Sequence, residues 1–372
     1  MVVVPSRPAK VSHPKAPRLA ANVRLPVMRP EGNEANAVHL LPPTLRCRRQ
    51  SDNKFDSHPA RHAATTSGMA SVHVDGALIH VETDSLTATV ATEGYVTGVK
   101  DGTLVDKKTG AHDLGYGLDI VDFLMEPGAS AETTPKELRY DFHNSYHGDI
   151  AKRYVALPQI CTQAKKLSWS IFEGEQWIAI CQWYRWDVAP PPHKPGSTWQ
   201  QWLVFQDGLR HFFACDTVVS ANDSDCLFMR LDMPGHLQHQ KGDNFEQVYL
   251  SYHGYIPSSE FAADFPPDGK FLYQRGKTPA PQRMIRGYKI KNGPWLAGLT
   301  LNPASVYEAW CHQRGYICFI EEIGGVKVKA GQGFSAAYAI GYFDDVPAME
   351  RVCDRQKGAT RIELQGGHYK IL

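Results

Sequence analysis

The chain has 372 residues, of which 42% are hydrophobic and 21% are charged, an ordinary composition for a globular protein. Its apolar runs are short and interrupted, so no segment is expected to span a bilayer and no membrane partner is expected. The net charge is +1, but residues 1–68 hold 11 Lys or Arg against 4 Asp or Glu, which leaves the rest mildly acidic. A broad electrostatic footprint for nucleic acid is therefore not expected.

The first 68 residues contain nine prolines, several basic residues and no sustained apolar period. This composition predicts a disordered, basic, Pro-rich tail, and patterned sequence begins at Met69, a candidate functional start. We expect residues 69–372 to form one β-sandwich catalytic domain. No secretory signal is visible, and none of the eight cysteines forms a CxxC pair. They are expected to be small buried hydrophobes in a reducing compartment, which favours the cytoplasm.

From residue 71 the sequence has the pattern of antiparallel β-structure. Residues 71–82, SVHVDGALIHVE, predict a hairpin around Asp75-Gly76. Residues 86–91, LTATVA, alternate apolar and polar side chains as a half-buried strand does. Ten further segments have strand patterns: 167–174, 177–186, 198–206, 211–220, 227–233, 248–254, 284–291, 294–301, 316–323 and 334–343.

Only two segments resemble helices. Residues 302–315, NPASVYEAWCHQRG, have Asn302 as a cap, Pro303 in the first turn and Gly315 just past the end. Residues 344–358 form the second candidate, and the Pro-rich residues 189–197 read as a loop. The fold class expected is all-β, a large antiparallel β-sandwich with few short helices.

One segment also suggests a family. The hairpin from Gly98 to Gly110, GVKDGTLVDKKTG, has the form G-x-V/I followed by D-x-x-T-G, and it lies within residues 71–117. This portion resembles the galactose-mutarotase-like supersandwiches, which occur in aldose epimerases, several glycosidases and polysaccharide lyases. The resemblance implies a supersandwich fold and an oligo- or polysaccharide as the partner.

A dense polar segment, FHNSYHGDIAKRY at residues 142–154, is the first candidate for chemistry. His143 and His147 point the same way in a strand or loop, so either is a candidate base, with Tyr146 as a further acid–base group. Asn144 and Arg153 are candidates for holding a substrate carboxylate. The alternative is a polar loop whose histidines bond to the backbone.

The second candidate is the His-rich stretch from Arg230 to Gly254. Tyr252 and His253 stand at a strand end, where either could act as the acid. An alternative use of the histidines is to bind a divalent metal, but their spacing matches no metal signature, and we expect no obligatory cofactor. The expected substrate-binding residues of this stretch are Arg230, His236, His239 and Lys241.

Six of the eight tryptophans fall within residues 169–202. Alternation in the QWYRW segment places Trp183 on one face with Arg185, and Tyr184 on the other with Trp186. Trp183 and Trp186 are therefore candidates for stacking on sugar rings, and the alternative for each is the core.

The combination favours a carbohydrate-active lyase that cleaves a uronate-containing glycan by β-elimination. That reaction needs a base, an acid for the leaving oxygen, and cations or amides that neutralise the carboxylate. The alternatives are an aldose epimerase with a His acid and Glu246 or Glu308 as base, a glycoside hydrolase, or a non-catalytic glycan-binding sandwich. Substrate charge separates lyase from epimerase, since a neutral aldose leaves Arg and Lys little to bind. Nucleotide-binding and serine-hydrolase motifs are absent from the sequence.

Overall fold

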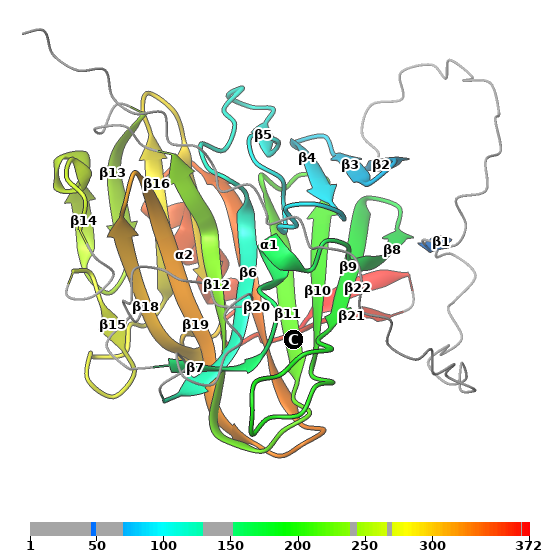
Figure 1. Cartoon of the computed structure of the whole chain (residues 1–372). Helices are drawn as coiled ribbons and strands as arrows, with labels where there is room; N and C mark the ends of the chain where they lie inside the picture. The colour runs from blue at the N-terminus through cyan, green and yellow to red at the C-terminus, as the bar shows by residue number, and fades with distance from the viewer. Residues whose placement is uncertain (1–45, 50–69, 129–151, 239–243, 266–269, 366) are drawn as a thin grey trace, which may run out of the picture. The chain divides into compact units, whose positions relative to one another are not determined.

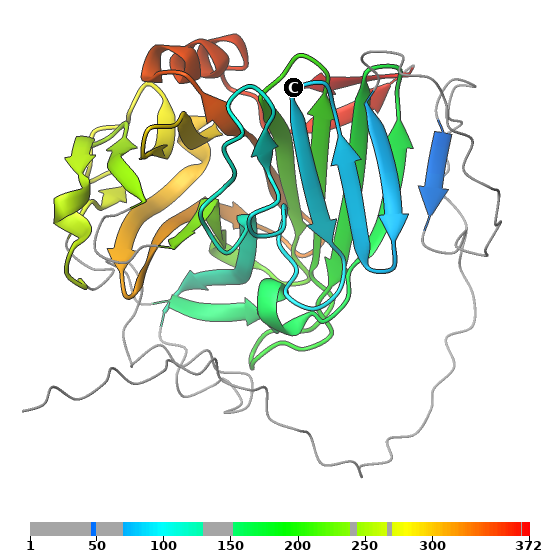
Figure 2. The ribbon, with the colours of Figure 1, turned by 90° about the horizontal axis from the view of Figure 1, so that it is seen from above.

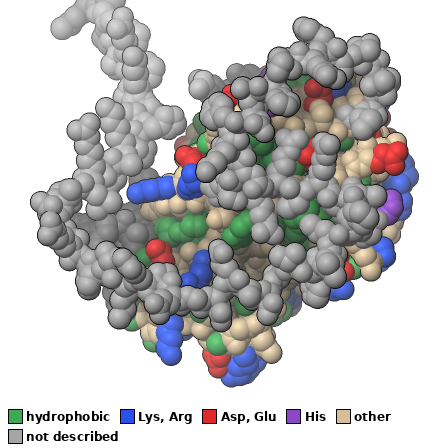
Figure 3. All heavy atoms as spheres, turned by 90° about the vertical axis from the view of Figure 1, so that its right-hand side faces the viewer, with side chains coloured by type: hydrophobic (Ala, Val, Ile, Leu, Met, Phe, Trp, Pro, Cys, Tyr) green, Lys and Arg blue, Asp and Glu red, His purple; other side chains and the backbone are tan. Residues whose placement is uncertain are grey.

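The computed structural model describes residues 46–49, 70–128, 152–238, 244–265, 270–365 and 367–372, which all belong to the compact unit Pro42–Leu372. The described part is mostly strand, and every pairing between its named strands is antiparallel. None of its helices has the length and apolar character needed to cross a membrane. In the face drawn in Figure 3, the described Lys and Arg side chains are interspersed with Asp and Glu.

The larger of two main sheets has ten strands (Figure 1). In spatial order they are β1 (Arg46–Arg49), β8 (Ser168–Glu173), β9 (Trp177–Arg185), β10 (Thr198–Gln206), β11 (His211–Val219), β20 (Gly333–Phe343), β17 (Trp295–Thr300), β16 (Met284–Ile290), β13 (Phe245–Leu250) and β14 (Gly254–Pro257).

The second main sheet has six strands and carries the candidate site described below. Its spatial order is β15 (Tyr273–Gln274), β18 (Val306–Gln313), β19 (Tyr316–Val328), β12 (Ser224–Gln238), β6 (Leu118–Pro127) and β7 (Lys152–Ala156). A four-stranded sheet beside β9 contains β2 (Ser71–Asp75), β3 (Leu78–Glu82), β4 (Leu86–Ala91) and β5 (Val105–Asp106) (Figure 2). The remaining elements are the hairpin β21 (Ile362–Gln365) and β22 (His368–Ile371), the helices α1 (Ile160–Gln163) and α2 (Val346–Arg355), and the 3-10 turns at Ser258–Phe261 and Pro303–Ser305.

The inner faces of the two main sheets form one hydrophobic core. On β12, Met229, Leu231 and Met233 belong to this core, while Arg230 and Asp232 alternate with them and project to the other face. On β19, Phe319 belongs to the core by the same alternation. The outer face of the six-stranded sheet therefore carries the polar side chains Arg230 and Asp232.

The structure confirms the expected all-β sandwich and most of its elements. The hairpin at residues 71–82 forms β2 and β3, residues 86–91 form β4, and each of the ten further segments contributes a strand. The helix expected near the C-terminus is α2, where the Asp345 carboxylate accepts a hydrogen bond from the Ala348 N–H at 2.7 Å.

The prediction of a helix over residues 302–315 is wrong. Asn302 does cap a turn, since its side chain accepts from the Ala304 N–H at 3.2 Å, but that turn ends at Ser305 and β18 follows. Both faces of β18 are buried, and its pairing with β19 shifts between Val306 and Glu308. Apolar residues on both faces of a bulged strand imitate the helical period, and cross-strand pairing decides the outcome.

Candidate functional site

Six of the residues proposed from the sequence lie outside the described part of the chain. They are His143, Asn144, Tyr146, His147, His239 and Lys241. The other seven are described, and they fall into separate surroundings.

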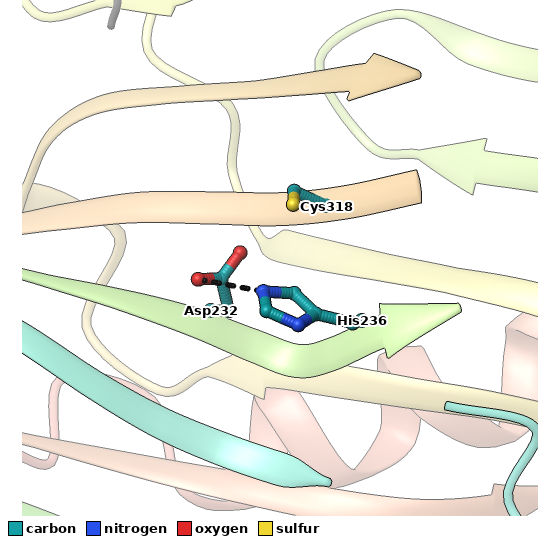
Figure 4. A group of neighbouring side chains, drawn as sticks. All are labelled: Asp232, His236 and Cys318. Atoms are coloured by element: carbon teal, nitrogen blue, oxygen red, sulfur yellow. Dashed lines mark ion pairs between the residues drawn. The ribbon is translucent and has the colours of Figure 1, made fainter. Parts of the chain in front are cut away.

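An acid–base pair forms on β12, where Asp232 and His236 lie on the outer face. Two residues four apart in a regular strand would be about 13 Å apart. The pairing of β12 with both neighbouring strands shifts between these residues, and this bulge brings His236 Nε2 to 3.2 Å from Asp232 Oδ2. Figure 4 shows the imidazole turned back along the strand toward the carboxylate.

The bulge depends on a glycine. Gly235 has a φ of +155°, and a Cβ at this position would lie 2.0 Å from the backbone oxygen of Gly117. Only a residue without a side chain permits this close approach of the two segments. The local sequence thus fixes the distance between Asp232 and His236.

A second carboxylate lies next to the pair. Asp122 on β6 accepts hydrogen bonds at Oδ1 from Gln159 Nε2 at 2.7 Å and from the Cys161 thiol at 3.3 Å. Burial, followed by the nearby Asp232 charge, raises the pKa of Asp122 to about 6. Burial of His236 disfavours its charged form, but Asp232 outweighs that effect and raises the pKa of His236 above its usual value.

The cluster continues along a row across the sheet. His236 on β12 pairs in register with Cys318 on β19, which in turn pairs with His312 on β18. Burial lowers the pKa of His312 to about 4, so this imidazole is neutral at pH 7. One carboxylate oxygen of Asp232, one nitrogen of His236 and the thiol of Cys318 lie within 4.8 Å of one another and could hold a metal ion.

Aromatic rings border the pair. The Tyr316 ring lies 5.2 Å from the His236 ring, and the Tyr116 ring lies 6.3 Å from it and 5.5 Å from Tyr316. Tyr95 is 39% exposed, and the pKa of its phenol is raised by burial, followed by the charges of Cys161, Asp122 and Asp232. Rings beside polar groups suit the apolar and hydroxylated faces of a sugar.

Arg230 has no free charge to offer a substrate. Its guanidinium donates to Glu322 Oε1 at 2.8 and 3.1 Å. Lys152 Nζ lies 2.7 Å from Glu308 and 3.2 Å from Glu322, and both cations lie over the ring of Trp310. All five side chains are buried, and two cations balance two carboxylates. Glu308, one of the two bases considered for an epimerase, is occupied here.

Arg153 is likewise paired, at a different place. It bonds Glu126 at 2.6 Å, and the same carboxylate accepts from His193 at 3.0 Å and from the Ser224 hydroxyl at 2.5 Å. Burial opposes ionisation of Glu126, but these hydrogen bonds prevail and lower the pKa of Glu126 to about 2. These four side chains line a cavity of about 440 Å³, which Lys327 also lines.

Tyr252 and His253 follow β13 and lie in surroundings of their own. The Tyr252 ring contacts Tyr273 at 5.7 Å, and burial raises the pKa of its phenol. His253 is exposed, and the centre of its ring lies 4.9 Å from that of Phe271 with the two rings nearly perpendicular. The structure therefore does not bring either residue to the His236 cluster.

The two tryptophans separate as the alternation predicted. Trp183 is 39% exposed, so its ring is available to a ligand. Trp186 is fully buried, its ring contacts Tyr184 at 6.0 Å, and its indole N–H donates to the Pro158 carbonyl at 2.9 Å. Trp186 has no exposed ring face on which a sugar could stack.

No family model matches the sequence, and no curated protein matches it. The solved structures that resemble the fold include a TPR-domain-containing protein from Parabacteroides distasonis, with 10% identity and a TM-score of 0.41 over 72% of this chain. A second is a 4-alpha-glucanotransferase from Thermococcus litoralis, with 10% identity and a TM-score of 0.33 over 75% of this chain. A third is a protein from Escherichia coli K12 described as a candidate aldose 1-epimerase, with 10% identity and a TM-score of 0.31 over 74% of this chain.

The chain covers 47% and 40% of the first two of these structures and 99% of the third. Two of the three are thus carbohydrate-related by their descriptions, but TM-scores this low carry no argument about what this chain does. The class that its own fold defines is an all-β sandwich protein with a polar cluster on the outer face of the six-stranded sheet.

Proposed function

We propose that this chain is a carbohydrate-processing enzyme that transfers protons to and from a neutral sugar, as an aldose epimerase does. The observation that supports this proposal is the His236–Asp232 pair beside the second carboxylate of Asp122. A histidine oriented by one carboxylate and standing next to another supplies an acid and a base in one place. Neither Glu246 nor Glu308 is needed, because Asp122 takes the role of the base.

The proposed reaction opens and closes the sugar ring. Asp122 takes the proton of the anomeric hydroxyl, His236 gives a proton to the ring oxygen, and the bond between the anomeric carbon and that oxygen breaks as the carbonyl forms. Rotation of the aldehyde exposes its other face to the returning hydroxyl oxygen. The two protons then move back, so His236 and Asp122 end in their starting states. Asp232 holds the imidazole in position throughout.

The state of the cations supports a neutral sugar over a uronate. A lyase must neutralise the substrate carboxylate, and Arg230 and Arg153 were the described candidates. Each already binds a glutamate of the protein, and Arg230 is buried. The lyase therefore stays a prediction that depends on His143, Asn144 and His147, which lie outside the described residues.

The test is a measurement of anomer interconversion by polarimetry or NMR exchange with a panel of aldoses. His236→Gln and Asp122→Asn should each lower the rate by about 100-fold or more, the typical contribution of one acid or base. His253→Gln is the matched control, since this exposed histidine lies outside the cluster and its variant should keep the wild-type rate.

Two outcomes would count against the proposal: no acceleration with any aldose, or full activity in His236→Gln. The same proteins should be incubated with uronate-containing polysaccharides while ultraviolet absorbance is recorded. An absorbance rise from the unsaturated product would establish the lyase in place of the epimerase.

A further inference from the structure

We propose that Asp232, His236 and Cys318 form a binding site for a thiophilic divalent cation of the zinc class, and that occupancy of this site stops proton transfer by His236. The second half rests on the proposed function, whereas the first half stands on the geometry of the three side chains. They offer a carboxylate, an imidazole and a thiol, the three kinds of ligand that zinc accepts in proteins.

The spacing of the three ligand atoms suits a four-coordinate ion. Bonds of about 2.0–2.3 Å in tetrahedral directions place neighbouring ligand atoms roughly 3.3–3.8 Å apart. The three atoms lie within 4.8 Å of one another, and Asp232 and His236 are already at 3.2 Å. Small rotations of the Cys318 side chain would complete the approach without movement of the strands.

A second observation independently points to a missing partner for Asp232. Its carboxylate is 3% exposed, and Oδ2 is the oxygen that faces His236. Oδ1 is buried and receives no hydrogen bond within the described part of the chain. A buried carboxylate oxygen without a donor is costly, and a cation bound by both oxygens of Asp232 would satisfy it.

The ligands are also held in advance by the sheet. His236 and Cys318 are direct cross-strand partners on β12 and β19, and the bulge at Gly235 brings His236 back toward Asp232. Figure 4 shows the three side chains on these two strands. Three protein ligands leave a fourth position for water or an exchangeable ligand. Because the site sits on rigid strands, binding requires little ordering of the chain.

Occupancy would change the chemistry of His236. Coordination of the cation by the imidazole nitrogen that faces Asp232 displaces the proton from that nitrogen, and coordination by Cys318 displaces the thiol proton; both protons pass to solvent. The coordinated imidazole keeps only the proton on its other nitrogen, and loss of that proton would leave an imidazolate, so the coordinated ring is a much weaker acid toward a ring oxygen than the imidazolium. Cation and proton therefore compete for the same atom, and the enzyme is active when the cation is absent.

The binding test uses the full chain, stripped with a chelator, reduced and titrated with Co²⁺. A cobalt–thiolate charge-transfer band should develop, and Zn²⁺ should abolish it by displacement. Loss of an outer partner of a metal site lowers affinity by about 10- to 100-fold, so removal of a ligand in Cys318→Ser should lower it by at least about 100-fold and remove the band. Cys353→Ser is the control: it changes a different buried cysteine, on α2, and should keep both the affinity for the cation and the charge-transfer band.

Thermal melting of both variants shows whether each is folded, and His236→Ala provides a second variant in which affinity should fall. A band that persists in Cys318→Ser, or wild-type protein that binds neither Co²⁺ nor Zn²⁺, would overturn the site.

The activity test separates the two halves of the proposal. Zn²⁺ should inhibit aldose turnover, a chelator should restore it, and the inhibition constant should rise at least about 100-fold in Cys318→Ser, in parallel with binding. Binding without inhibition, or activation by Zn²⁺, would overturn the competition. If no protein turns over any aldose, the proposed function fails, and the cobalt band alone decides whether the cation site exists.

Discussion

Arg230 donates two hydrogen bonds to one oxygen of Glu322, while Lys152 approaches the other oxygen of the same carboxylate at 3.2 Å. Glu322 thus neutralises parts of two buried cations at once: Arg230 lies on the neighbouring strand β12, and Lys152 lies on the edge strand β7. This arrangement explains why residues that suggest substrate binding in the sequence serve the fold.

Glu322→Gln should therefore be strongly destabilising. The substitution keeps the shape of the side chain but leaves an excess positive charge among buried residues, which typically costs about 3–5 kcal/mol. Urea unfolding at neutral pH measures the loss in the free energy of unfolding. Glu363→Gln is the control, because Glu363 pairs with Arg361 at the surface, with both side chains more than half exposed, and should change stability by less than about 1 kcal/mol. Equal effects in the two variants would contradict the assignment of Glu322 to the fold.

Gly235→Ala should disturb the bulge of β12 and lower both the stability and the turnover of the protein. A methyl group here meets the Gly117 oxygen at 2.0 Å, so the segments must move apart, and overpacking of this kind costs about 1–3 kcal/mol. Because the bulge sets the distance between His236 and Asp232, turnover should fall as well. Gly208→Ala is the matched control: Gly208 also has a positive φ, +80°, but nothing lies within 4 Å of its added Cβ. Loss of turnover in Gly208→Ala alone would argue against the role of the bulge.

A buried carboxylate between the two sheets should make stability depend on pH. Asp216 accepts from the Trp199 indole at 2.8 Å, and burial raises the pKa of Asp216 to about 7. Because the folded protein binds this proton more tightly than the unfolded chain, the stabilisation is complete below about pH 4 and is lost as pH rises through about 7. The wild-type urea midpoint should fall across this window relative to that of Asp216→Asn, which imitates the protonated acid at every pH. Parallel curves for the two proteins would show that Asp216 does not titrate in this way.

The sequence predicted strands better than it predicted contacts. Turn residues such as Asp75-Gly76 and the alternation in β4 are local signals, and they identified the elements correctly. The register between strands does not depend on neighbouring residues. No residue close to Arg230 in the sequence indicates that Glu322, 92 residues away, neutralises its charge.

For the same reason, the sequence did not identify Cys318, Asp122 and the tyrosine rings as parts of the candidate site. His236 was identified because histidines cluster in its segment, but its partners are set by a bulge and by pairing across four strands. The motif Met233-Pro234-Gly235 was the available local signal, since Pro and Gly within a strand pattern often mark a bulge.

The two tryptophans proposed for sugar stacking should behave differently when removed. Trp186→Ala deletes a fully buried ring and its hydrogen bond to Pro158, and should cost about 3–5 kcal/mol in the free energy of unfolding. Trp183→Ala removes a ring that is 39% exposed, and should change stability by less than about 1 kcal/mol. Trp183 lies on the outer face of the ten-stranded sheet, whereas His236 lies on the six-stranded sheet, so Trp183→Ala should leave KM and kcat of the proposed reaction unchanged. Substrate titrations and urea unfolding of both variants check this; a raised KM in Trp183→Ala would instead assign Trp183 to the sugar-binding surface.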